Sequence, residues 1–139
     1  MELRQIRPPN KAEQKAVAAL RSGKYKQGHH LLCGHGCHCI LGVINEAVEG
    51  EQGWHEREDM EQAFEYRSKG HTSRIAITHD VQRKLGWSDT TGWLVRPING
   101  HSSLLELNDR GYMDFIDLAH VIASGWVKLD DEGHKGLAW

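Results

Sequence analysis

Residues 39–50, CILGVINEAVEG, carry the pattern that decides the fold. Apolar side chains recur there at intervals of three and four, which is the spacing of one face of an α-helix. The pattern stops near Gly50, and it begins close to Cys39. We therefore predict a helix across this stretch, with its apolar face formed by Ile40, Leu41, Ile44, Ala47 and Val48.

Three more helices are predicted around this one. Asn10, with Glu13 three residues later, has the form of a capping box, and an apolar stripe follows it, so we predict a helix over residues 11–21. Thr78 is placed to cap a brief helix that Gly86 ends. Asp114 is placed to cap a final helix, whose apolar face ends before Gly125.

Strands are predicted mainly in the second half of the chain. Residues 74–77, 93–98, 103–107 and 126–129 are strand-like, and the turn dipeptide Asn99-Gly100 favours a hairpin between the second and third of them. Pro97 places its strand at an edge. Residues 51–70 are rich in charge, and Met60, Ala63 and Phe64 suggest a weak, exposed helix there. The expected fold class is α+β, with three to four helices packed on a small antiparallel sheet of three or four strands.

The length and composition match one ordinary domain, residues 1–139, with mobile ends at residues 1–9 and 130–139. Lys and Arg total 17 against 19 acidic residues, so the net charge of −2 does not favour nucleic acid as a partner. Charge is nevertheless uneven: the first 26 residues are basic, whereas residues 46–65 are strongly acidic. Without a long apolar run or a secretory signal, the protein is expected in the cytoplasm and away from membranes.

All three cysteines and four of the ten histidines lie in residues 29–44, HHLLCGHGCHCILGVI. Thiolates and imidazoles are zinc ligands, so this segment is a candidate zinc site. The spacing of the cysteines is not that of a recurrent zinc knuckle, and buried cysteines acting as small core residues are the alternative. The candidate ligands are Cys33, Cys37, Cys39, His35 and His38, with His29 and His30 as further possibilities.

Cys39 also suggests a second kind of chemistry, because the start of a helix lowers the pKa of a thiol. An activated thiolate there would need a base, for which His120 and His79 are candidates, and Asn108 or Asp109 could orient that base. The alternative is that Asn108 and Asp109 serve a turn, where such side chains bond their own backbone.

A compact group of cationic, aromatic and amide side chains follows the first predicted helix. Gly23 and Gly28 flank it and hold it on a loop, where binding residues concentrate. Such a group suits a phosphate, a base edge or an acidic protein surface, and a solvated face is the alternative. Its members are Arg21, Lys24, Tyr25, Lys26 and Gln27.

Four blocks in one order resemble a family of small, uncharacterised phage and prophage proteins: AALRSGKYKQG, CILGVINEAVE, THDVQRKLGW and LELNDRGYMDFIDLAHVIAS. The resemblance runs from about Ala12 to Ser124. Cys39 falls where that family usually carries a cysteine, but the neighbouring position, often a second cysteine, is Ile40 here. The resemblance implies phage-related biology and no particular mechanism.

Three functions remain open from the sequence. The first is a non-enzymatic, phage-type protein that captures a host factor, either a protein surface or a small anionic metabolite such as a nucleotide, with counter-defence as its setting. The second is a cysteine- or zinc-dependent enzyme centred on Cys39, and the third is a structural zinc module. An open sheet edge could also support a homodimer.

Overall fold

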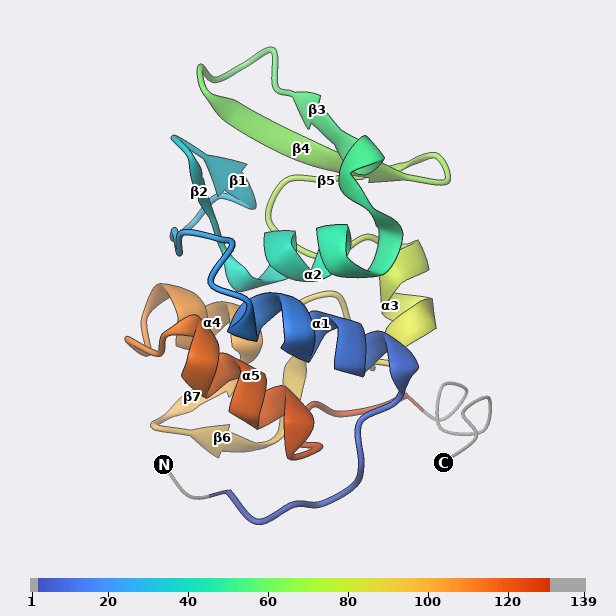
Figure 1. Ribbon diagram of the computed structural model, residues 1–139, viewed down its shortest axis with the longest axis vertical. Helices are drawn as coiled ribbons and strands as arrows, with labels where there is room; N and C mark the ends of the chain where they lie inside the picture. Colours follow the sequence, from blue (N-terminus) through green and yellow to red (C-terminus); the bar gives the residue numbers. More distant parts are fainter. Residues whose placement is uncertain (1–2, 131–139) are drawn as a thin grey trace.

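The computed structural model describes residues 3–130, and its helices begin where the capping residues predict (Figure 1). The capping box of α1, Lys11–Arg21, is present: Asn10 Oδ1 accepts from Glu13 N at 2.9 Å, and Glu13 Oε1 accepts from Asn10 N at 3.0 Å. Helix α2 spans Ile40–Glu49, with Cys39 as its N-cap and Gly50 after its last residue. Thr78 and Asp114 cap α3, His79–Leu85, and α5, Phe115–Ala123.

The larger sheet has five antiparallel strands. They are β1 (Cys33–Gly34), β2 (Cys37–His38), β3 (Trp54–Glu56), β4 (Ala63–Ser68) and β5 (His71–Ser73). Their order is β2-β1-β4-β3, and β5 also pairs with β4. A short 3-10 helix, η1 (Glu51–Gly53), leads from α2 into β3. The sheet therefore joins the Cys- and His-rich connector, which supplies β1 and β2, to residues 54–73, which supply β3, β4 and β5.

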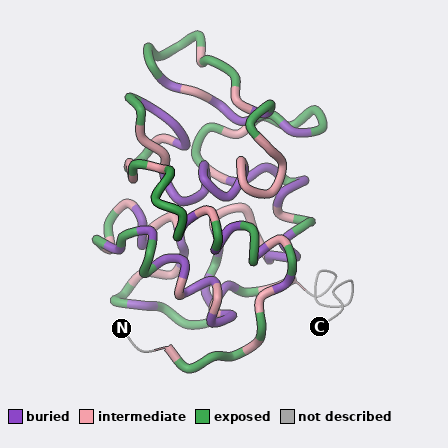
Figure 2. Tube along the Cα trace, in the orientation of Figure 1, coloured by how far each residue is buried: buried purple, intermediate pink, exposed green. Residues whose placement is uncertain are grey.

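Helix α2 lies at the centre of the molecule, between the larger sheet and α1, which in turn packs on α5 (Figure 1). Its first five residues are buried, and the burial along the chain in Figure 2 follows this central layer. At Gly42 a Cβ atom would lie 2.1 Å from Leu32 O, so only glycine lets the connector pass this close to the helix. The first two turns of α2 thereby fix the position of the connector.

Three elements expected as strands differ in the structure. Residues 104–109 form a helix, α4 (Leu104–Asp109), because Ser103 Oγ accepts from Glu106 N in the arrangement of an N-cap. The predicted hairpin is present, with strands β6 (Trp93–Ile98) and β7 (His101–Ser103). Residues 74–77 form no strand, since 74–76 are bends, and residues 126–129 contribute only isolated bridges to Trp87 and Leu94.

The weak helix predicted within residues 51–70 is wrong, since β3 and β4 occupy that region. Glu65 lies buried in β4, where Arg67 Nε and Arg74 Nε donate to its carboxylate at 2.9 and 3.2 Å. A charged side chain at a buried position interrupts the alternation that normally reveals a strand. The α+β class is confirmed, with five α-helices where three to four were expected.

Residues 3–9 run along the end of α5, where Ile6 N donates to Ser124 O at 2.8 Å. The mobility expected of residues 1–9 stays a prediction, and residues 131–139 of the expected mobile tail lie outside the described residues. No helix within residues 3–130 is long and apolar enough to cross a lipid bilayer.

Candidate functional site

Asn108, at the end of α4, fastens the connector between α1 and α2. Its side chain is fully buried, and Oδ1 accepts from Gln27 Nε2 at 2.9 Å and from Ile40 N at 3.2 Å. Its Nδ2 group donates to Gly28 O at 2.9 Å and to Asp109 Oδ1 at 2.8 Å. One amide thus joins the loop, the start of α2 and the end of α4.

Asp109 and the two histidines before β1 extend the same network. Asp109 Oδ1 accepts from His30 N at 3.1 Å, and His29 Nδ1 lies 2.7 Å from Asn108 O. A carbonyl only accepts hydrogen bonds, so His29 Nδ1 carries the proton. The sequence predicted that Asn108 and Asp109 bond their own backbone in a turn. They lie instead at the end of α4, and their polar atoms hold the backbone of the distant connector.

Cys39 lacks the exposure and the lowered pKa of a nucleophilic cysteine. The side chain is 1% exposed, and burial raises the pKa of its thiol to about 12. The N–H groups at the start of α2 lower that pKa by less than burial raises it. Within the described residues neither His79 nor His120 makes a hydrogen bond to Cys39; the His79 ring instead stacks edge-on against His71 at 5.2 Å. The geometry gives no support to an activated thiolate at this position.

The candidate zinc ligands are spread over both faces of the β1–β2 hairpin. Cys33 pairs with His38 and Gly34 with Cys37, so the side chains of Cys33 and Cys37 project to opposite faces. His35 Nδ1 lies 3.2 Å from Gln62 Oε1 on the turn of the hairpin. Across residues 3–130, no group of three or more His, Cys, Asp or Glu side chains is gathered so that it could hold a metal ion.

The basic loop of residues 21–27, which begins at the last residue of α1, is anchored at its far end. Gln27 Nε2 donates to Asn108 Oδ1 and to Met113 O, at 2.9 and 2.8 Å. Around it the main chain pairs with β2, since Gly28 N donates to His38 O at 2.7 Å and His38 N donates to Lys26 O at 2.8 Å. The loop therefore presents its outer side chains from a fixed backbone.

The five side chains of the loop have different surroundings. Lys24 lies 3.6 Å from the carboxylate of Glu46 and 3.3 Å from that of Glu51, and the Tyr25 hydroxyl donates to Glu46. Gln27 is used to anchor the loop, as described above. Arg21 and Lys26 are exposed, and neither makes an ion pair with any described residue. These two cations remain available to an anionic partner.

Sequence reasoning missed Glu46 and Trp54, which complete the surroundings of the loop. Trp54 Nε1 donates to Glu46 Oε1 at 3.0 Å, and Tyr25, His38 and Trp54 form a row of edge-to-face rings with centroids 5.1 and 5.5 Å apart. Burial and then the charge of Lys24 lower the pKa of His38, which keeps its imidazole neutral. No local pattern links these residues, because the fold brings them together from four separate segments: the connector after α1, β2, α2 and β3.

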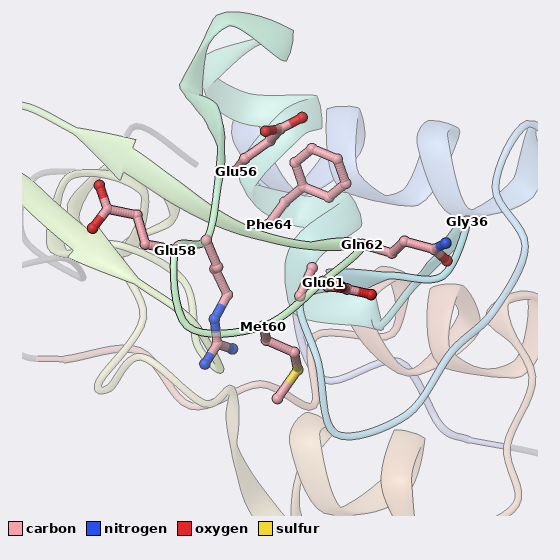
Figure 3. A pocket seen from close by; sticks show the side chains of 9 residues that line it. Gly36, Glu56, Glu58, Met60, Glu61, Gln62 and Phe64 are labelled. Carbon is pink, nitrogen blue, oxygen red and sulfur yellow. The ribbon is translucent and has the colours of Figure 1, made fainter.

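A cavity of about 690 Å³ lies beside the β3–β4 hairpin, lined by Gly36, residues 56–58 and residues 60–64 (Figure 3). Glu56 lies beside Phe64 at one end, and Gln62 extends toward Gly36 at the other. Met60, on the loop between the strands, is 41% exposed. The cavity is therefore open, with both apolar and acidic walls.

Residues 9–125 match a family described as a domain of unknown function, DUF8296. The chain belongs to this family. The matched region includes every helix and strand described above and ends just after α5. No curated protein and no solved structure matches the chain.

Proposed function

We propose that this protein acts by binding, as a phage-type accessory protein that captures a host factor in the bacterial cytoplasm, with counter-defence as its setting. The single observation that carries the proposal is the anchored loop of residues 21–27, which offers Arg21 and Lys26 without an ion pair from the described chain. Preorganised loops bind well because less conformational freedom is lost on association. The partner at this loop is an anionic group, on a host protein or on a small metabolite such as a nucleotide.

The surroundings of Cys39 favour binding over a cysteine-dependent reaction. The thiol is buried, its pKa is raised, and the neighbouring Asn108 and Asp109 are used to hold the connector. An activated cysteine needs partial exposure and an electropositive environment. The phage setting rests on the order of the four sequence blocks.

The double variant R21A/K26A tests this proposal against the control K11A/K15A. Both remove two cations, but Lys11 and Lys15 lie exposed on α1. Each purified protein is immobilised, incubated with bacterial cytosol and eluted, and the bound proteins and nucleotides are quantified by mass spectrometry.

We expect the wild type and K11A/K15A to retain the same factor and R21A/K26A to lose at least nine-tenths of it. The identified factor should then bind the purified wild type and not R21A/K26A in a titration. Equal retention by R21A/K26A would show that the loop is not the binding surface.

A further inference from the structure

The strand β3 leaves one edge of the larger sheet open. It pairs only with β4 among the strands of residues 3–130. Arg57 N donates to Ala63 O at 2.9 Å, so the backbone groups of residue 57 face β4. Backbone groups of successive residues in an antiparallel strand face opposite sides, and therefore the N–H and C=O groups of Glu56 face outward.

This open edge is acidic. Glu56, Glu58 and Glu61 make no ion pair with any described residue. The cations of the connecting loop region are already paired with Asp59: Arg57 donates two hydrogen bonds to it, at 2.7 and 2.9 Å, and Arg74 lies 3.3 Å from it. The carboxylates of the edge are thus not neutralised by the protein itself. Two copies of β3 placed side by side would bring like charges together, which disfavours pairing of this edge with itself.

The cavity described above opens beside the same edge and supplies apolar contact. Phe64 is half-buried and stands next to Glu56, its partner across the two strands, and Met60 is exposed on the connecting loop (Figure 3). An aromatic ring beside a carboxylate suits the alkyl stem and the charge of a lysine or arginine. The edge therefore combines unpaired backbone groups, carboxylates and an apolar recess.

We propose that β3 is a docking edge for an extended, basic segment of another protein. The segment pairs with the outward backbone groups of Glu56, and the charges of its Lys or Arg side chains meet Glu56, Glu58 and Glu61. Because Glu56 and Phe64 share one face of the sheet, the alkyl stems of these same basic side chains enter the cavity at Met60 and Phe64. Addition of a strand to an exposed sheet edge is a recurrent mode of peptide recognition, in which backbone bonds give affinity and side-chain pockets give specificity. This surface is separate from the loop of residues 21–27, so the two proposals can fail independently.

The test uses the capped hexapeptide Lys-Val-Lys-Val-Lys-Val as probe and two controls. Glu-Val-Glu-Val-Glu-Val keeps the strand propensity and reverses the charge, and a lysine peptide with N-methyl groups at alternate residues keeps the charge and removes backbone donors. Binding is followed by NMR of the Glu56 amide and of the methionine methyl groups, with the buried Met113 as internal reference.

The basic peptide is expected to shift the Glu56 amide and the Met60 methyl saturably, and neither control peptide should do so. E56Q/E61Q should weaken binding by about five- to tenfold, because exposed ion pairs contribute only a few-fold each. R21A/K26A should bind the peptide like the wild type. The proposal is overturned if the shifts do not saturate, if the N-methylated peptide binds equally well, or if E56Q/E61Q leaves the affinity unchanged.

Discussion

Asn108→Leu removes the amide that joins the connector to α2 and α4, while leaving a side chain of similar size. The substitution leaves Gly28 O and Ile40 N without a side-chain partner, whereas Gln27 Nε2 keeps Met113 O. Each buried polar group left without a partner costs about 1–3 kcal/mol, so we expect the free energy of unfolding to fall by about 2–6 kcal/mol. For a domain of this size that loss lowers the Tm by roughly 6–18 °C.

Urea unfolding followed by tryptophan fluorescence measures the loss, and amide hydrogen exchange locates it. Protection should fall first at the amides of Gly28 and His38, because the loop depends on this anchor. Gln14→Leu, at an exposed position on α1, is the control and should change stability by less than about 0.5 kcal/mol. A loss below about 1 kcal/mol for Asn108→Leu, with unchanged exchange in the loop, would refute this reasoning.

Three further results are expected. Glu13→Gln should lower the free energy of unfolding by about 3 kcal/mol in a urea titration. The reason is that the buried carboxylate accepts hydrogen bonds from Arg7 at 2.7 and 2.9 Å and from Trp87 Nε1 at 3.0 Å. A loss near zero would contradict that role. Gly42→Ala should lower the free energy of unfolding by about 1–3 kcal/mol in the same measurement, because the added methyl group would clash with Leu32 O. An alanine variant as stable as the wild type would contradict this close approach of the connector to α2. Cys39 should react with a thiol reagent more slowly than the half-buried Cys37 at neutral pH. Folding raises the pKa of the Cys39 thiol from 9.0 to about 12, because the buried site favours the neutral thiol. The stability that this neutral thiol contributes should be complete below pH 9 and be lost as the pH rises toward 12. The stability of C39A should lack this pH dependence.

The helices could be predicted from the sequence wherever a cap and an apolar stripe occur together. Asn10 and Glu13 mark the start of α1, and the stripe beginning at Ile40 marks α2. Helix α4 also has such a signal, Ser103 with Glu106 three residues later, but its apolar residues read equally well as a strand. Short apolar runs leave this ambiguity, which tertiary packing resolves.

The larger sheet could not be predicted, because its strands are short and its buried positions include charge. Glu65 lies inside because Arg67 and Arg74, from different segments, supply its partners. The sequence identified the loop of residues 21–27 as a group. It could not indicate that Lys24 is ion-paired while Arg21 and Lys26 are not, because Glu46 and Glu51 are brought beside Lys24 only by the fold. Nor could local sequence indicate how deeply Cys39 is buried.

Native and denaturing mass spectra of the protein purified from bacterial cytosol without chelator test the central claim most directly. If the protein acts by binding through its anchored loop, the native spectrum should show a mass excess that is lost on denaturation, retained by K11A/K15A and absent from R21A/K26A. A mass excess that survives in R21A/K26A and disappears in C39A would contradict the account and return attention to the cysteine.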